Sequence, residues 1–510
     1  MREAEGASMQ FSYPGVYIEE LESPVRPIVG AETSVTAFVG PTLTGPTTPT
    51  TVESWDDFES QFGGLWRGSE LSYAVYQFFL NGGAKAIVVR VGDAPEYARV
   101  DLGNEIKLKA RAPGAQGNDL KVTVTHDATS NMQYALVITA ATTTESYDVT
   151  IDPALRSRWL GRQLETSQLV QPDADVFDQR PDAATDKRFT NGRDGTFTPN
   201  HALGNSSTRP HTGLAALADV EIFNLLVIPA QLAKPASGTD NRDNAWAPVV
   251  DAAVRLCEER RAMLLLDPPF AWETPEVAVT KAQSGLPVTG LIGRNAAVFF
   301  PKVQISDPLG GELMVGPAGT VAGVIARTDT RRGVWKAPAG TDDGGLLGVR
   351  SLAFRLTDQQ NGSLNKLGVN CLRTFPVYGN VQWGARTCRG ADAMSDPWKY
   401  IPARRVALHI EESLFVGTKW VVFEPNDEPL WSSIRLNVGA FMNRLFRQGA
   451  FQGRTAKDAY FVRCDAGNNP QADIDQGIVT VDVGFQPLSP AEFVHIRIQQ
   501  KRDDATAQGS

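Results

Sequence analysis

The feature that most constrains the fold is a pair of short, uninterrupted apolar runs with a helical pattern between them. The runs at residues 36–40 and 86–91 lack the apolar–polar alternation of a strand with one face in water. Between them, apolar residues recur at helical spacing after Ser69, a good N-cap, and the pattern closes at Asn81-Gly82-Gly83. Strand–helix–strand units with wholly apolar strands are typical of a parallel sheet that helices cover on both faces.

This strand–helix–strand pattern is interrupted once and then resumes. From about residue 97 the sequence pattern changes to short Thr- and Val-rich strands. It predicts an inserted antiparallel β domain with strands at 106–110, 120–125, 134–139 and 146–151. The polar stretch 171–211 favours a long or poorly ordered surface loop. The α/β pattern returns with strands at 223–228, 263–267 and 296–300, a helix near 244–261 and a helix starting at Thr274-Pro275.

A third region runs from about residue 367 to the end. It combines strands (369–374, 381–387, 459–464, 478–485) with helices near 402–416 and 427–448. The second helix has one apolar face made of Trp431, Ile434, Val438, Phe441, Met442, Leu445 and Phe446. We therefore expect an α/β and α+β multidomain protein, with a doubly wound α/β domain at 31–96 and 213–366. The inserted β domain and its polar loop would occupy 97–212, and a C-terminal α+β domain would occupy 367–486.

The two ends of the chain, 1–30 and 487–510, each carry a lone strand pattern without a hairpin partner. Near the N-terminus, Val16 and Ile18 follow the turn signal Tyr13-Pro14-Gly15. At the other end Val494, Ile496 and Ile498 alternate with polar residues after a Pro487–Pro490 hinge. Such strands need a sheet edge, which is either an edge of the protein's own sheet or an edge in a neighbouring molecule.

Composition excludes several classes of protein. A net charge of −9 argues against a nucleic-acid coat, because duplex binding needs a basic face. No apolar run approaches the length of a membrane span, and residues 1–10 lack the features of a signal peptide, so we expect the chain to stay in the compartment where it is made. Cys257, Cys371, Cys388 and Cys464 have no metal-ligand spacing and are expected to be buried, reduced thiols.

The sequence also lacks the usual signatures of catalysis. The five histidines are scattered, and there is no nucleophile elbow and no Walker-type glycine loop with its lysine. The glycine-rich stretch 316–323 is interpreted as the start of a close-packed helix rather than a phosphate cradle. We therefore expect no catalytic residues, no metal site and no cofactor. The alternative is an α/β hydrolase-like enzyme with an inserted β domain, which would need histidine and acidic groups in one deep pocket.

Several stretches, taken in order, resemble the tail sheath proteins of contractile phage tails and of phage-tail-like contractile injection particles. They are Tyr13-Pro14-Gly15-Val16-Tyr17, Ser34-Val35-Thr36-Ala37-Phe38-Val39-Gly40, Phe79-Leu80-Asn81-Gly82-Gly83, Arg332-Gly333-Val334-Trp335-Lys336, Gly368-Val369-Asn370, Trp383-Gly384-Ala385-Arg386-Thr387 and Phe423-Glu424-Pro425-Asn426. The resemblance covers nearly the whole chain and is weakest between about residues 97 and 214. An inner-tube or baseplate component fits less well, because of the three-domain length and the two terminal arms.

The resemblance implies a non-enzymatic subunit that stacks as hexameric rings around an inner tube and contracts to drive the tube through a target envelope. It implies self-assembly, contacts with inner tube, baseplate and terminator or cap proteins, and no nucleic acid or direct membrane insertion. The terminal arms would complete sheets in adjacent subunits, and the region from residue 367 would face the tube. Candidate tube contacts are Arg444, Arg447, Arg454 and Lys457. The protein would be made in the bacterial cytoplasm and become part of a phage tail or injection particle.

Overall fold

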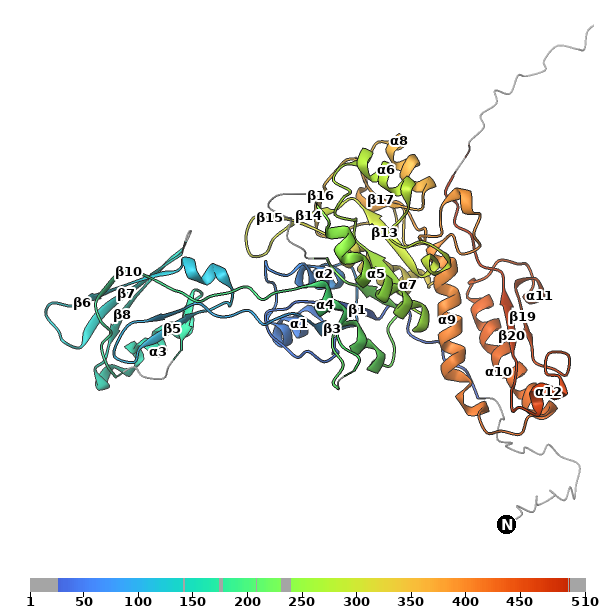
Figure 1. Ribbon diagram of the computed structural model, residues 1–510, viewed down its shortest axis with the longest axis horizontal. Helices are drawn as coiled ribbons and strands as arrows, with labels where there is room; N and C mark the ends of the chain where they lie inside the picture. The colour runs from blue at the N-terminus through green and yellow to red at the C-terminus, as the bar shows by residue number, and fades with distance from the viewer. Residues whose placement is uncertain are drawn as a thin grey trace, which may run out of the picture. The chain divides into compact units, whose positions relative to one another are not determined.

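The computed structural model describes residues 26–140, 143–173, 178–207, 209–230, 240–493 and 495. It divides into two compact units, drawn in Figure 1 with colour running from blue to red along the chain. Unit 1 contains residues 26–30 and Ser413–Gln486, and unit 2 contains Ala31–Glu412 and the chain from Pro487 onward. The chain therefore leaves unit 2 after α9 begins and returns to it at Pro487.

The centre of unit 2 is an eight-stranded sheet with the order β18-β17-β13-β12-β11-β1-β3-β2. Neighbouring strands from β17 to β3 are parallel, and the two edge strands β18 and β2 are antiparallel to their neighbours. The bounds are β1 (Thr36–Gly40), β2 (Thr50–Val52), β3 (Ala86–Arg90), β11 (Leu225–Val227), β12 (Met263–Leu266), β13 (Ala296–Phe300), β17 (Asn370–Phe375) and β18 (Gly379–Gln382).

Both faces of this sheet are buried, as the uninterrupted apolar strands predicted. In β1, Ala37 and Val39 belong to one hydrophobic cluster, while Phe38 belongs to the other. Successive strand residues point to opposite faces, so a strand with two buried faces must be apolar throughout. The helices that contribute to the first cluster include α5 (Arg242–Glu259), α6 (Pro275–Ser284) and α8 (Asp358–Lys366), and those that contribute to the second include α1 (Trp55–Phe62), α2 (Glu70–Leu80) and α7 (Ala318–Arg332).

The predicted helix ends are confirmed where capping residues marked them. The Ser69 side chain accepts a hydrogen bond from the Ser72 N–H at the start of α2, and Thr274 does the same for Val277 at the start of α6. Asn81 is the C-cap of α2, and Gly82 follows with a φ of +107° that favours glycine.

The glycine-rich stretch 316–323 is a close-packed helix start, as expected. Helix α7 begins at Ala318 and packs against α2. A Cβ added to Gly319 would lie 2.4 Å from the carbonyl oxygen of Ala74, and one added to Gly323 would lie 2.5 Å from that of Phe78. The glycines therefore allow the two helix backbones to approach each other.

The inserted region folds around a hydrophobic cluster of its own, and its four predicted strands are confirmed. An antiparallel sheet has the order β10-β6-β7-β8, and a smaller one has the order β4-β5-β9. The bounds are β4 (Arg99–Asp101), β5 (Lys107–Ala110), β6 (Lys121–His126), β7 (Gln133–Thr139), β8 (Thr144–Thr150), β9 (Val170–Pro172), β10 (Ala184–Arg188) and α3 (Leu160–Gln163).

The expectation of a long loop at 171–211 is wrong. Strand β10 in this stretch pairs with β6, and helix α4 (Pro199–Leu203) follows it. Most side chains of β10 are exposed, so the strand carries no apolar alternation that the sequence could reveal. Phe189, directly after it, is buried.

Unit 2 also contains a small sheet of order β15-β14-β16, and short 3₁₀ helices occur in both units. The strands are β14 (Val303–Ser306), β15 (Glu312–Val315) and β16 (Val349–Leu352). The 3₁₀ helices are η1 (Ala115–Asp119), η2 (Pro153–Arg158), η3 (Leu164–Thr166), η4 (Gly213–Asp219), η5 (Leu291–Asn295), η6 (Asp392–Met394) and η7 (Lys419–Val421).

Unit 1 is built on the helix with the predicted apolar face. This helix, α10 (Glu428–Arg447), is capped by Asp427 and buries Trp431, Ile434, Val438, Phe441, Met442 and Leu445. Helix α9 (Ile401–Gly417) begins in unit 2 and ends in unit 1. The remaining elements are α11 (Ala456–Ala459), α12 (Gln471–Ile474), β19 (Tyr460–Arg463) and β20 (Asp482–Phe485).

The predicted domain boundary at residue 367 needs correction. Strand β17 lies beyond it, yet pairs in parallel with β13, and β18 then forms the edge of the same sheet. Residues 367–412 therefore belong to unit 2. The pairing of β13 with β17 joins segments about seventy residues apart, and the local sequence pattern does not predict such a pairing.

Candidate functional site

The first candidate site is the small sheet of unit 1. Strands β19 and β20 pair antiparallel, with Tyr460 opposite Phe485 and Arg463 opposite Asp482. Within the described residues this sheet has two strands, so each strand has one edge without a strand partner. An open edge presents backbone N–H and C=O groups to which an extended segment can add.

Aromatic packing holds this sheet on the rest of unit 1. The ring of Phe451 lies 6.1 Å from that of Tyr460 and 5.3 Å from that of Phe485, centroid to centroid. The Gln452 N–H donates to the carbonyl of Gln486, at the end of β20. By contrast, the side chain of Phe461 is exposed. The two-stranded sheet is thus packed against the rest of unit 1, while the outer edge of each strand has no strand partner among the described residues.

The second candidate site is the start of the C-terminal segment on unit 2. We call residues 487–493 the segment base. None of these residues is buried, and residues 488–493 line one side of an open cavity of about 700 Å³ whose other side includes Trp335 and Trp383. Pro487 takes part in an isolated β-bridge, and within the described chain residues 488–493 belong to no helix or strand. Glu492 makes the side-chain polar contacts between the segment base and the rest of unit 2.

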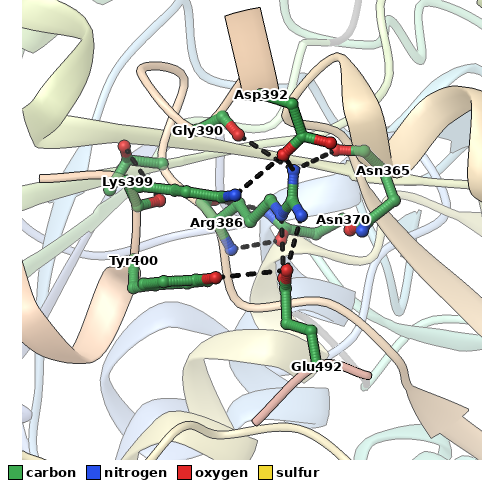
Figure 2. A network of polar contacts seen from close by, with 9 residues as sticks. Asn365, Asn370, Arg386, Gly390, Asp392, Lys399, Tyr400 and Glu492 are labelled. Carbon is green, nitrogen blue, oxygen red and sulfur yellow. Dashed lines mark hydrogen bonds and ion pairs between the residues drawn. The ribbon is translucent and has the colours of Figure 1, made fainter. Parts of the chain in front are cut away.

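Glu492 is bound by Arg386, whose side chain is fully buried (Figure 2). The guanidinium donates from Nε to Oε1 of Glu492 at 2.8 Å and from Nη2 to Oε2 at 2.5 Å. Its Nη1 donates to the carbonyl oxygens of Asn365 and Gly390 and to the carboxylate of Asp392. Such bidentate pairing fixes a carboxylate in orientation as well as in distance.

Two further side chains complete the network in Figure 2. The Tyr400 hydroxyl donates to Oε2 of Glu492 at 3.2 Å, and Lys399 pairs with Asp392 at 2.7 Å. The backbone of Arg386 is held by Asn370, whose amide also donates to the Val298 carbonyl in β13. Because Asn370 begins β17, the main sheet positions the arginine.

The residues predicted to form the terminal arms lie outside the described part of the chain. They are Val16, Ile18, Val494, Ile496 and Ile498. Their assignment as inter-subunit strands stays a prediction. Apart from His495, the described residues end at Phe493, directly before the predicted C-terminal strand.

The four basic residues predicted to meet the tube lie at the end of α10 and just beyond it, and all are exposed. Arg444 donates to the carbonyl oxygen of Ile28 and lies over the ring of Phe441, so part of its role is structural. Arg447, Arg454 and Lys457 have no ion pair with a described residue. Their role as tube contacts stays a prediction.

Metal ligands are not brought together in the described chain. Its His, Cys, Asp and Glu residues form no cluster that could hold a metal ion. The four cysteines are free and buried, and burial raises the pKa of the Cys371 and Cys388 thiols to about 12. Among the described helices, none combines the length and the apolar character needed to cross a bilayer.

Comparison with known proteins finds similar chains among tail sheath proteins. Residues 394–501 match the family model for the phage tail sheath C-terminal domain. The tail sheath protein of Vibrio phage KVP40 is 27% identical over 188 residues, which is 37% of this chain and 27% of the viral protein. The resemblance to contractile tail sheath proteins is confirmed. The match spans about a quarter of that relative's length.

The fold is that of solved sheath structures. The contracted sheath of an extracellular contractile injection system, PVC, aligns with a TM-score of 0.57 at 23% identity, over 97% of this chain and 99% of that one. The contracted helical sheath of the anti-feeding prophage aligns with a TM-score of 0.57 at 24% identity, over 96% of this chain and 100% of that one. The proteins matched are named as sheath components, which agrees with the expectation that the chain is not an enzyme.

The Arg386–Glu492 pair was not predicted from sequence. Arg386 stood in one of the stretches that resemble sheath proteins, but nothing marked Glu492 as its partner. The signal that was available is an arginine that follows Gly384 and Ala385 in a stretch with few other charges. A buried arginine needs a carboxylate, yet the sequence separation of 106 residues hides which one.

Proposed function

We propose that the chain is a structural sheath subunit that polymerises as stacked hexameric rings around an inner tube. Contraction of this polymer would drive the tube through a target envelope. Baseplate and cap proteins would bind at the ends of the sheath. The comparisons with tail sheath proteins and the matching sheath fold support this proposal.

The observation that carries the proposal is the small sheet of unit 1, which has an open edge on each strand within the described residues. A C-terminal strand from a neighbouring subunit would add to this sheet, and the N-terminal strand would serve as a second arm. Each cross-strand pair contributes about 0.2–1 kcal/mol in addition to the ladder hydrogen bonds. Several pairs per arm would keep neighbouring subunits tethered while the lattice rearranges.

A truncation after Phe493 tests the proposal, because it removes the predicted strand and retains Glu492. We expect a folded monomer with an unchanged melting temperature that no longer forms polymers. Replacing Ile496 by Asp should act in the same way, since it places a charge on the buried face of the intermolecular sheet.

Analytical sedimentation, thermal unfolding and negative-stain microscopy measure these outcomes, for the protein alone and with its genomic neighbours. Cross-striated tubes from the wild type, and none from the truncated chain, support the proposal. A truncated monomer that melts earlier and aggregates would instead place the strand in the sheet of its own subunit.

A further inference from the structure

The contact between Arg386 and Glu492 differs from an ordinary surface ion pair. The Arg386 side chain is fully buried, and that of Glu492 is 17% exposed. Exposed pairs contribute little, because water screens them and their side chains are free to move. A buried guanidinium that already donates to two carbonyl oxygens holds a carboxylate at one position.

Arg386 is fixed independently of Glu492. Its backbone N–H donates to Asn370 Oδ1 at 2.6 Å, and its carbonyl accepts from Asn370 Nδ2 at 2.7 Å. Its Nη1 also pairs with Asp392, which Lys399 holds from the other side. The guanidinium of Arg386 is therefore held in position by these other contacts, and the carboxylate of Glu492 binds to it.

The segment base has little else to hold it. Its residues are exposed or half-buried, and those after the β-bridge at Pro487 belong to no helix or strand of the described chain. An open cavity of about 700 Å³ lies beside residues 488–493. Pro487 and Pro490 further limit backbone pairing, because proline has no N–H. Among the described residues, the side chain of Glu492 therefore makes the polar contacts that tie the segment base to unit 2 just before the C-terminal strand.

We propose that Arg386 is a positioning residue that holds Glu492 and thereby fixes where, and in which direction, the C-terminal strand leaves its subunit. This inference rests on the proposed function, in which that strand enters a neighbouring sheet. A strand that starts from a fixed point searches a smaller volume before it pairs, so its effective concentration at the acceptor edge is higher. Loss of the pair should impair polymerisation while unit 2 stays folded.

The test compares two neutralising substitutions in the same network. Glu492→Gln removes the carboxylate carried by the segment base, and Asp392→Asn removes the other carboxylate bound to Arg386. Both leave the guanidinium with one charged partner, but only the first loosens the segment. Glu492→Ala serves as a second, more severe variant.

We expect Glu492→Gln to raise the protein concentration needed for polymerisation about tenfold or more, and Asp392→Asn to leave it nearly unchanged. Limited proteolysis within residues 487–493 of the monomer should become faster in Glu492→Gln and Glu492→Ala alone, because the segment base is then free to enter a protease site. Thermal unfolding of the three variants checks that unit 2 remains folded.

Equal polymerisation of Glu492→Gln and the wild type would overturn the inference, as would equal impairment by Asp392→Asn. In the second case the network would act through the stability of unit 2 and not through the segment. A wild-type chain that never polymerises would instead count against the proposed function, so the two failures are distinguishable.

Discussion

At the scale of single residues, a carboxyl group at the end of β12 stands out. Asp267 accepts a hydrogen bond from the Ala318 N–H at the start of α7, at 2.8 Å. Burial raises its pKa to about 7, and the nearby Glu70 carboxylate adds to the effect, whereas the Ala318 N–H and Lys302 oppose it. Glu70 also has a raised pKa, chiefly through burial. The chain thus keeps two carboxyl groups near a single lysine.

The raised pKa of Asp267 predicts that the protein loses stability as pH rises toward neutrality. The unfolded chain releases this proton near pH 4, whereas the folded chain holds it up to about pH 7. Between these values the folded state binds more protons, so the free energy of unfolding falls with increasing pH, by at most about 1.4 kcal/mol per pH unit.

Replacing Asp267 by Asn should remove the part of this slope that Asp267 contributes, because the amide oxygen still accepts from Ala318 and carries no proton to lose. The raised pKa of Glu70 leaves a smaller slope of the same sign. Denaturant unfolding between pH 5 and 8 measures how the free energy of unfolding changes with pH, and the variant Asp251→Asn, at an exposed position, is the control. A pH dependence in Asp267→Asn that equals that of the wild type would contradict the assignment.

At the scale of elements, the packing of α2 against α7 depends on small residues at one contact. Gly319 lies so close to the backbone of Ala74 that any Cβ would have to displace a main-chain atom. Backbone atoms shift less readily than side-chain ends, so the helices themselves would have to separate. Both helices cover one face of the large sheet.

Gly319→Ala should therefore destabilise unit 2 by about 1–3 kcal/mol, despite the higher helix propensity of alanine. Gly362 in α8 is a matched control, because a Cβ added there meets nothing within 4 Å. Gly362→Ala should stabilise the protein by about 0.5–1 kcal/mol. Chemical denaturation of both variants gives the comparison, and a neutral Gly319→Ala would show that the helix contact is not tight.

At the scale of the whole molecule, charge distribution bears on assembly. The chain has a net charge of −9, yet the end of α10 and the residues after it carry exposed arginine and lysine side chains. Basic groups on an acidic protein favour an acidic partner surface, for which we proposed the inner tube. Contacts of this kind affect the rate and specificity of association and weaken with salt.

The double substitution Arg447→Glu and Arg454→Glu should lower the yield of sheathed tubes, and the loss should change with salt concentration. A control with Lys187→Glu and Arg188→Glu in β10 reverses two exposed charges on the inserted domain instead. Electron microscopy of particles purified at low and high salt counts the sheathed tubes. Equal yields from the two double variants would remove these arginines from the tube contact.

Local sequence determined much of the secondary structure. The side chains of Ser69, Thr274 and Asp427 each accept a backbone N–H at the start of a helix, so the signal and the structure lie within a few residues of each other. The wholly apolar strands likewise required a sheet with two buried faces. These are short-range effects, and they hold wherever the chain folds.

Only the tertiary structure decided which distant segments meet. Strand β17 joins β13 and moves the expected domain boundary, and strand β10 lies in a stretch too polar to indicate a strand. Glu492 reaches Arg386 across 106 residues, and its role follows from burial and geometry that no local pattern encodes. Such pairings are set by packing and by the need of buried charges for partners, which depend on the complete fold.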